Sequence, residues 1–316
     1  MPWQILNMAD TTSCPDLFAS LAPMANVVSL PPRRETLLER IAGFDAYFAS
    51  LHVRLDREAL DKTNRLRVIA TASTGLDHID LAAAAEKRIT ILSLKEETDF
   101  LDQVTSTAEL AWGLLLATVR RIPWAFGSAL EGRWARDGFR GRQLSGKTVG
   151  ILGYGRLGRM VAEYGKAFRM RVLACDIRDV QPADGVEMVD LDGLLRESDV
   201  LSIHVHLSDA TRGMISRNEF AKMKRGSILI NTSRGAIVDE HAMLEALRCG
   251  LIAGAGLDVI DGEWDSDLKQ HPVIRYAREH QNLVISPHVG GITFEAQKMA
   301  YEFTAGKLKR HLERLA

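Results

Sequence analysis

A short apolar run that ends in three spaced glycines constrains this sequence most. Residues 148–152 are mostly apolar. The G-x-G-x-x-G pattern of Gly153, Gly155 and Gly158 follows at once, and helix-forming residues come after it. The first glycine permits a tight turn, the second lets a diphosphate approach the backbone, and the third lets the helix pack on the strand. The pattern therefore predicts a strand, a phosphate-binding turn and a helix, which together form a dinucleotide site. The alternative is a glycine-rich turn that binds no ligand.

A second apolar run, residues 172–175, ends in an acidic residue about 20 positions after the last of these glycines. A carboxylate at such a strand end accepts hydrogen bonds from the adenosine ribose and repels a 2′-phosphate. Asp176 therefore predicts NAD as the cofactor rather than NADP. Arg178, two residues later, is the one nearby feature that could soften this preference.

Composition places the chain among ordinary globular proteins. Its 316 residues predict two domains, and its net charge of −1 gives no indication of a nucleic-acid or acidic membrane partner. The sequence has no apolar run long enough to span a membrane. Three scattered cysteines are typical of a reducing compartment. We therefore expect a cytoplasmic protein with a small-molecule ligand.

The first hundred residues alternate short apolar runs with helical segments. We expect strands at 5–8, 27–30, 46–49, 68–71 and 90–94, and helices at 33–41, 56–64 and 81–87. This alternation predicts a small parallel sheet covered by helices.

The rest of the chain continues the alternation on a larger scale. A long, mostly apolar helix is expected over 104–121, and a last helix over 293–315. Strands at 200–205, 227–231, 253–259 and 283–286 bring the second sheet to six, the number that a full dinucleotide fold needs. We expect an α/β fold with two parallel sheets. A flavodoxin-like substrate domain, residues 1–100 completed by 291–316, accompanies a Rossmann dinucleotide-binding domain, residues 101–290.

Three loops after the last three strands carry side chains suited to acid–base chemistry. Arg234 can hold a carboxylate through two parallel hydrogen bonds. His288 can exchange a proton with a carbonyl oxygen while a hydride is transferred at carbon. Glu263 can bond the other imidazole nitrogen and favour its charged form, although Asp261 and Asp265 are close enough in sequence to take this place. The set predicts a 2-keto acid substrate.

The loop of residues 72–80 follows the fourth expected strand and contains a glycine. Loops at the carboxyl ends of parallel strands commonly bind ligands, and their backbone N–H groups can hold a carboxylate. The alternative is a tight turn that Asp80 caps.

A polar, glycine-bearing segment over residues 130–146 contains Trp134 and predicts a protruding arm. Trp134 is either the anchor of a subunit contact or a tucked tryptophan in a surface loop.

Three histidines leave their roles open. His204 and His206 share one strand face, but no third ligand accompanies them, so we expect no metal site. His52 and Arg54 follow another strand, where they either meet the distal group of a substrate or lie on the surface.

With these motifs the chain resembles the D-isomer-specific 2-hydroxyacid dehydrogenases. That family includes D-3-phosphoglycerate and D-lactate dehydrogenases and glyoxylate and hydroxypyruvate reductases. The resemblance spans nearly the whole chain and is strongest in residues 146–153, the glycine motif, 231–235, 258–259 and 286–291. It implies an NAD(H)-dependent homodimer that interconverts a 2-keto acid and a D-2-hydroxy acid.

The resemblance also implies roles for single residues. Arg234 binds the substrate carboxylate, while Glu263 and His288 form the acid–base pair. Thr74 and Gly75 offer backbone groups to the substrate. The cofactor positions that it implies are Arg156 and Leu157 at the diphosphate, Asp176 at the adenosine ribose, and Thr232 and Asp258 on the nicotinamide side.

Two positions depart from the family pattern. Trp264 follows Glu263 where the family commonly has proline, and the family's His-x-Pro-Leu is here His204-Val205-His206-Leu207.

Two other functions stay open. One is a phosphite- or formate-type dehydrogenase on the same scaffold, although formate oxidation pairs the histidine with glutamine. The other is an NAD(H)-sensing, corepressor-like interaction protein with little turnover.

Overall fold

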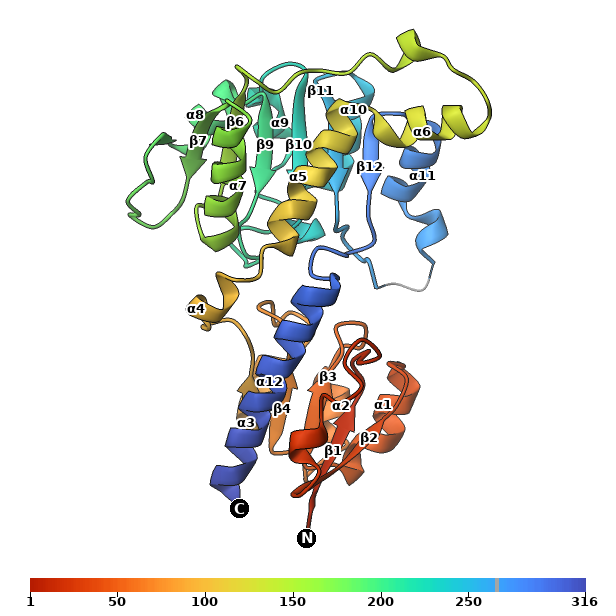
Figure 1. Cartoon of the computed structure of the whole chain (residues 1–316), viewed down its shortest axis with the longest axis vertical. Helices are drawn as coiled ribbons and strands as arrows, with labels where there is room; N and C mark the ends of the chain where they lie inside the picture. The colour runs from red at the N-terminus through yellow and green to blue at the C-terminus, as the bar shows by residue number, and fades with distance from the viewer. Residues whose placement is uncertain (265–266) are drawn as a thin grey trace. The chain divides into compact units, whose positions relative to one another are not determined.

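The computed structural model describes residues 1–264 and 267–316. The chain divides into two compact units, residues 1–104 with 292–316 and residues 105–291 (Figure 1). Each unit is built around its own parallel β-sheet. The predicted α/β fold with two parallel sheets is therefore confirmed. No helix in the described part of the chain has the length and apolarity to cross a membrane.

The first unit contains a five-stranded sheet in the order β2-β1-β3-β4-β5. The strands are β1 (Trp3–Asn7), β2 (Ala25–Ser29), β3 (Ala46–Ala49), β4 (Val68–Thr71) and β5 (Thr90–Leu92). Every residue of β3 and β4 is buried, because each of these strands is paired on both edges and covered on both faces. This burial explains why their sequences are continuous apolar runs.

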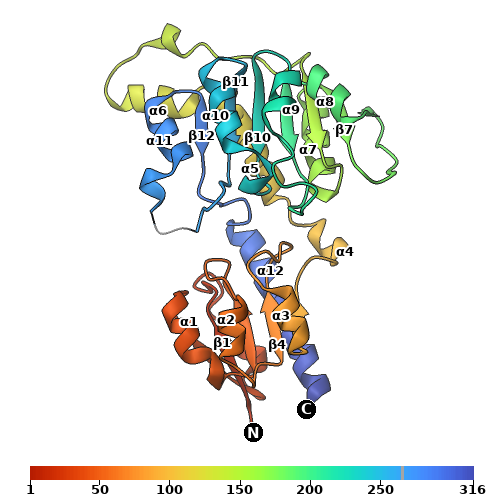
Figure 2. The same ribbon diagram turned by 180° about the vertical axis from the view of Figure 1, so that it is seen from behind.

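Helices cover both faces of this sheet (Figures 1 and 2). One face packs against α1 (Arg34–Arg40), α2 (Arg57–Asp61) and α3 (Leu81–Glu86). The other packs against α12 (Phe294–Leu315) and the short 3₁₀ helix η1 (Ala19–Leu21). The remaining helices of the unit are η2 (Ile41–Gly43) and α4 (Thr98–Leu101). The last helix of the chain thus completes the hydrophobic core of the first unit.

The second unit contains a seven-stranded sheet in the order β12-β11-β10-β9-β6-β7-β8. The strands are β6 (Thr148–Leu152), β7 (Arg171–Cys175), β8 (Val186–Met188), β9 (Val200–Ile203), β10 (Ser227–Asn231), β11 (Ile252–Leu257) and β12 (Leu283–Ile285). The sequence predicted six, so the count was wrong by the edge strand β8. From β6 the strands that follow in the chain are added first on one side of the sheet (β7, β8) and then on the other (β9 to β12). This change of side creates the crevice where such sheets bind ligands.

Two layers of helices enclose this sheet. One face packs against α5 (Ser106–Val119) and α7 (Arg156–Ala167). The other, seen in Figure 2, packs against α8 (Leu191–Glu197), α9 (Arg217–Lys222), α10 (Glu240–Arg248) and α11 (Pro272–Glu279). Two short 3₁₀ helices, η4 (Gly235–Ile237) and η5 (Leu268–Gln270), lie in the loops after β10 and β11.

The segment between α5 and β6 differs from the sequence expectation. The predicted helix over 104–121 stops at Val119, and Arg121 turns the chain with a φ of 55°. A further helix, α6 (Ile122–Leu130), follows and is itself followed by η3 (Arg136–Phe139). Figures 1 and 2 show that α6 and the following segment extend away from the sheet of this unit.

Candidate active site

The turn between β6 and α7 has the form that the glycine pattern predicts. Gly153 has a φ of 96°, which favours glycine, and its N–H donates to the carbonyl oxygen of Cys175 at 2.8 Å. A Cβ at Gly158 would lie 2.1 Å from the carbonyl oxygen of Gly153, so no side chain fits there. Arg156 is the first residue of the twelve-residue helix α7, after Gly155 as N-cap. The helix N-terminus therefore presents N–H groups that suit a diphosphate.

Asp176 lies at the end of β7 and is held by two partners. The Tyr154 N–H donates to Oδ2 at 2.8 Å. Arg178 donates from its backbone N and its Nε to Oδ1, and from a guanidinium nitrogen to Oδ2, each at 2.9 Å. The Arg178 hydrogen bonds lower the pKa of the Asp176 carboxyl. The sequence identified both residues, but it did not show that they pair with each other.

His288 and Glu263 come together in the second unit. The Nδ1 atom of His288 lies 2.7 Å from Oε1 of Glu263, and both side chains are largely buried. The loops after β11 and β12 supply the two residues. Asp261, the alternative acid, is exposed, and its N–H donates to Oε1 of Glu240 at 2.8 Å. Asp265, the other alternative, lies outside the described residues.

Asp258 organises the loop that carries His288. Asp258 is 1% exposed, and its Oδ1 accepts the Ser286 hydroxyl at 2.5 Å and the Val289 N–H at 2.9 Å. Oδ2 accepts the Gly290 N–H at 2.8 Å. The buried charge is therefore compensated by donors from the loop itself.

Arg234 follows β10, where Asn231 shapes the turn. The Asn231 side chain donates to the Arg234 carbonyl oxygen at 2.9 Å and accepts the Ser233 N–H at 3.0 Å. A Cβ at Gly235 would lie only 2.0 Å from the carbonyl carbon of Ile260. The loops after β10 and β11 thus meet backbone to backbone, which places the loops of Arg234 and Glu263 side by side.

The hydroxyl of Thr232 offers a test of whether a cofactor suits this edge of the sheet. Its Oγ1 atom is buried, and no described residue forms a hydrogen bond with it. A buried hydroxyl without a partner is unfavourable, so it favours a ligand group that supplies one. Thr232, the glycine turn and Asp176 all lie at the carboxyl edge of this sheet. The residues present therefore fit a dinucleotide.

His204 follows β9 at the same edge. Ser202 Oγ lies 2.8 Å from its Nε2, while its Nδ1 is buried and has no partner in the described part of the chain. Burial lowers the pKa of the His204 imidazole to about 4. The described residues contain no group of three or more His, Cys, Asp or Glu side chains that could hold a metal ion.

Thr74 and Gly75 lie in the first unit, in the loop after β4. The Ser73 hydroxyl donates to the Gly75 carbonyl oxygen at 2.8 Å. Asp80 is the N-cap of α3 and accepts the Ala83 N–H at 2.9 Å, so it caps this helix and not the turn before it. His52 and Arg54, in the loop after β3, are both exposed.

Sequence reasoning missed a second acidic residue and histidine beside the Glu263 loop. His271 Nε2 lies 2.9 Å from the carbonyl oxygen of Asp261 and 3.6 Å from Oε2 of Glu240. Burial raises the pKa of the Glu240 carboxyl. The contacts of Glu240 and His271 hold the loop that carries Glu263 in place. A sequence motif could not reveal them, because the two residues lie in separate elements.

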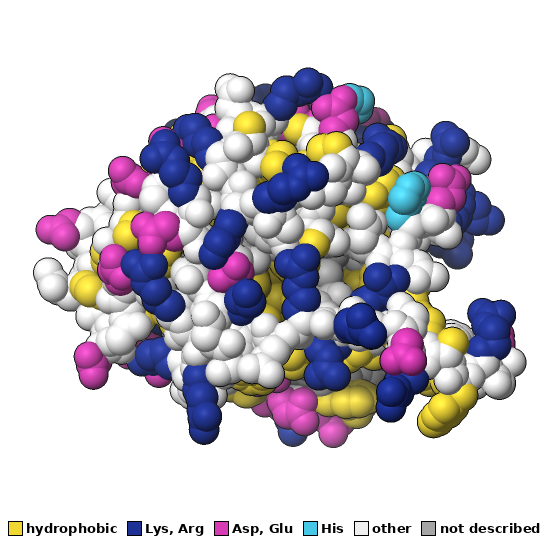
Figure 3. All heavy atoms as spheres, turned by 90° about the horizontal axis from the view of Figure 1, so that it is seen from above, with side chains coloured by type: hydrophobic (Ala, Val, Ile, Leu, Met, Phe, Trp, Pro, Cys, Tyr) yellow, Lys and Arg dark blue, Asp and Glu magenta, His cyan; other side chains and the backbone are white. Residues whose placement is uncertain are grey.

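Basic side chains are numerous on the face in Figure 3, with acidic side chains among them. Ion pairs balance several basic residues of the second unit. Arg171 pairs with Glu187 at 2.7 Å and with Glu197 at 2.6 Å, and Lys224 pairs with Asp199 at 3.0 Å. These pairs balance basic side chains of the second unit without a ligand.

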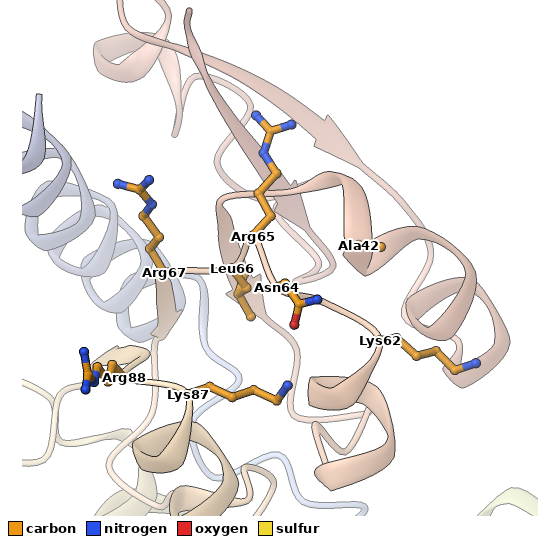
Figure 4. A pocket seen from close by; sticks show the side chains of 8 residues that line it. All are labelled: Ala42, Lys62, Asn64, Arg65, Leu66, Arg67, Lys87 and Arg88. Carbon is orange, nitrogen blue, oxygen red and sulfur yellow. The ribbon is translucent and has the colours of Figure 1, made fainter.

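A hollow of about 650 Å³ lies in the first unit, lined by residues that precede β3, β4 and β5 (Figure 4). Its cationic groups do not converge, since Arg65, Arg67 and Arg88 point in different directions. Arg65 bonds Asp45 through two nitrogens, at 2.6 and 3.0 Å, and Arg67 lies over the Trp3 ring. The hollow therefore lacks the geometry of an anion site.

Comparison with known proteins decides the family. The model of the "D-isomer specific 2-hydroxyacid dehydrogenase, NAD binding domain" matches residues 112–290. The chain belongs to the D-isomer-specific 2-hydroxyacid dehydrogenase family. The predicted family and enzyme class are thus confirmed, and a nicotinamide dinucleotide is the class of cofactor.

Individual relatives support this membership. A D-3-phosphoglycerate dehydrogenase of Methanocaldococcus jannaschii is 37% identical over 88% of this chain, which spans about half (52%) of that relative. A hydroxypyruvate reductase of Thermotoga maritima is also 37% identical, over 84% of each chain. The structure of D-lactate dehydrogenase from Aquifex aeolicus, complexed with NAD and lactic acid, has a TM-score of 0.84 and 27% identity. The match covers 98% of this chain and 95% of the D-lactate dehydrogenase chain.

Proposed function

We propose that this chain interconverts a 2-keto acid and a D-2-hydroxy acid by hydride transfer with NAD(H). The observation that carries the proposal is the 2.7 Å contact between His288 Nδ1 and Glu263 Oε1. A carboxylate on one imidazole nitrogen orients the ring, and this leaves the other nitrogen for proton exchange with a substrate. Both residues are supplied by loops at the carboxyl edge of the sheet, where α/β enzymes bind ligands.

Each residue of the set has its own task in the proposed reaction. Arg234 holds the substrate carboxylate by paired hydrogen bonds. During reduction His288 donates its Nε2 proton to the carbonyl oxygen, and in the reverse direction it accepts the hydroxyl proton. Glu263 balances the positive charge of the imidazolium. A bound nicotinamide supplies or accepts the hydride.

We infer that the glycine turn binds the diphosphate through Gly153, Gly155, Arg156, Leu157 and Gly158. Asp176 is assigned to the adenosine ribose, and this assignment favours NAD over NADP. Thr232 and Asp258 are assigned to the nicotinamide side, and Thr74 and Gly75 to substrate contacts. The buried hydroxyl of Thr232, to which no described residue forms a hydrogen bond, supports its assignment to the nicotinamide side.

A panel of 2-keto acids tests the proposal. Oxidation of NADH and NADPH is followed with glyoxylate, hydroxypyruvate, pyruvate, phenylpyruvate and longer acids. We expect turnover with at least one acid, and loss of most of it in His288→Asn with NADH binding retained. Tight NADH binding without turnover of any acid contradicts the proposal and supports a dinucleotide-sensing protein. NADH formation from phosphite or formate supports the other dehydrogenase class.

We also infer that the arm with Trp134 forms a homodimer contact. Ile122, Phe126, Leu130 and Trp134 lie on α6 or just after it, and all four side chains are exposed. Such a row of large apolar side chains is typical of an interaction surface. Light scattering should give twice the chain mass, and Trp134→Asp should shift the protein toward the monomer. A monomer at working concentration contradicts this inference.

A further inference from the structure

Trp264 lies beside the acid–base pair, and the proposed reaction gives it no task. It directly follows Glu263, and its indole ring stacks on the imidazole of His288. The two ring centroids are 5.7 Å apart and the ring planes are inclined by 28°. Trp264 as a whole is 47% exposed. The side chain is thus placed against a reactive group and not within an apolar core.

We propose that Trp264 is a positioning residue that fixes the plane of the His288 imidazole for proton transfer. This inference rests on the proposed function. Its geometric basis is that two successive residues, Glu263 and Trp264, contact the same ring in different ways. One forms a hydrogen bond at a ring nitrogen, and the other covers a ring face.

The two contacts restrict different motions of the ring. The hydrogen bond at Nδ1 fixes where that nitrogen lies, but it still permits the imidazole to tilt about the bond. The second side-chain torsion of histidine is broad, so the backbone alone does not prevent this tilt. A stacked indole opposes the tilt, because tilting separates the two ring faces. Together the contacts fix the direction of Nε2, the nitrogen left for the substrate.

The position of His288 in the backbone makes this restraint more important. Its φ of 54° is uncommon for a residue other than glycine, and the loop is held by main-chain hydrogen bonds. Those bonds fix the Cα atom and leave the ring orientation to side-chain contacts. Catalytic groups must be held within a narrow angular range, so a loss of ring restraint lowers the rate.

The stack itself can be measured without turnover. An indole face shifts the resonances of the imidazole C–H protons of a stacked histidine upfield. The His288 resonances are assigned by their loss in His288→Asn. We expect Trp264→Leu to move these resonances downfield and Trp264→Phe to retain part of the upfield shift. Resonances that do not move in Trp264→Leu overturn the inference, whatever the activity of the protein.

Kinetics then test the consequence of the stack. We expect Trp264→Leu to lower kcat about threefold to tenfold with little change in KM, and Trp264→Phe to restore most of it. In a His288→Asn background, Trp264→Leu should cause no further loss. Trp3→Leu, in the other unit, is the matched control and should leave kcat and KM unchanged.

The outcomes separate this inference from the proposed function. A raised KM at unchanged kcat shows that Trp264 contacts the substrate, and it overturns a positioning role. Equal kcat in Trp264→Leu and the unaltered chain also overturns it, while the proposed function stands. Absence of turnover by the unaltered chain overturns the proposed function itself, and the resonance experiment still reports whether the rings stack.

Discussion

The backbone N–H of His288 donates to the carbonyl oxygen of Asp258 at 2.8 Å, so the proposed acid–base residue is tied directly to the end of β11. The Asp258 carboxylate accepts the N–H groups of Val289 and Gly290, the two residues that follow. These bonds hold His288 at a φ of 54°, a conformation that is unfavourable for a residue with a side chain. The sequence predicted a cofactor role for Asp258, and the structure shows that its carboxylate shapes the His288 loop.

We predict that Asp258→Asn lowers kcat about tenfold to a hundredfold. The amide has the shape of the carboxylate, but it places an NH₂ group where one oxygen accepted a bond. A buried N–H of the loop then loses its acceptor, which costs about 1–3 kcal/mol and displaces His288. Measurement of kcat and of the NADH dissociation constant separates the loop role of Asp258 from its proposed cofactor role. Weaker NADH binding at unchanged kcat contradicts the loop role.

Ser286→Ala is the matched control for this prediction. It removes one donor to Asp258 and leaves the carboxylate and the two N–H contacts in place. We therefore expect a smaller loss of kcat, about threefold, and no change in NADH affinity.

A second prediction concerns the charge of Glu263. Glu263→Gln retains a hydrogen-bond acceptor for His288 Nδ1 and removes only the negative charge. A hydrogen bond to a charged group contributes about 1.5–3 kcal/mol, so we expect kcat to fall between about tenfold and a hundredfold. Stopped-flow reduction of the accepted 2-keto acid measures this loss. Asp261→Asn is the control, because Asp261 is exposed and should give the unaltered rate. A loss of kcat in Asp261→Asn with an unaltered rate in Glu263→Gln would assign the role of partner to His288 to Asp261.

A third prediction concerns cofactor choice. Arg178 is 61% exposed and bonds both oxygens of Asp176, and a 2′-phosphate could compete for the same guanidinium. We expect Arg178→Ala to raise the preference for NADH over NADPH about twofold to fivefold, the scale of one exposed ion pair. Asp176→Ala should lower that preference, since it removes the repulsion of the phosphate. The ratio of kcat/KM with the two cofactors measures both effects, and a ratio that Arg178→Ala leaves unchanged refutes the role of Arg178.

The central strands of the fold could be predicted because the pattern of apolar residues along the chain is enough to identify them. Residues 46–49 and 68–71 were predicted as strands with the bounds of β3 and β4, since each is a short apolar run that is buried throughout. The strand β8 has only three residues at a sheet edge, so it carries no such pattern. The helix α6 exposes several of its apolar side chains, which conceals the usual amphipathic signal.

The residues of the candidate site likewise include some that the sequence predicts and some contacts that only the structure shows. Motifs could place Arg234 and His288 after their strands, because spacing along the chain determines which loop they occupy. The Asp176–Arg178 pair and the fastening of Asp261 to His271 depend on side-chain directions and on contacts between separate elements. No spacing rule encodes such contacts, so they had to come from the structure.

The fourth prediction concerns the stability of the second unit in acid. The pKa of the His204 imidazole is lowered by burial from 6.5 to about 4. Between these values the unfolded chain binds a proton that the folded chain does not bind. Stability therefore falls as the pH drops from 6.5 to about 4, and is unaffected by this group above 6.5. The shift corresponds to about 3 kcal/mol at the acid end of this range.

His204→Gln removes the titrating group and keeps a polar atom near the Ser202 hydroxyl, which lies 2.8 Å from Nε2 in the unaltered chain. The comparison uses thermal unfolding of both proteins at several pH values from 8 to about 4. Carboxylates whose pKa values are lowered, such as Asp45 and Asp199, lose their contribution in both proteins, so the difference isolates His204. We expect the two unfolding midpoints to keep a constant separation above pH 6.5, and the unaltered chain to lose stability faster below it. Parallel curves over the whole range mean that the folded protein accommodates a protonated His204, and they refute its burial as a neutral imidazole.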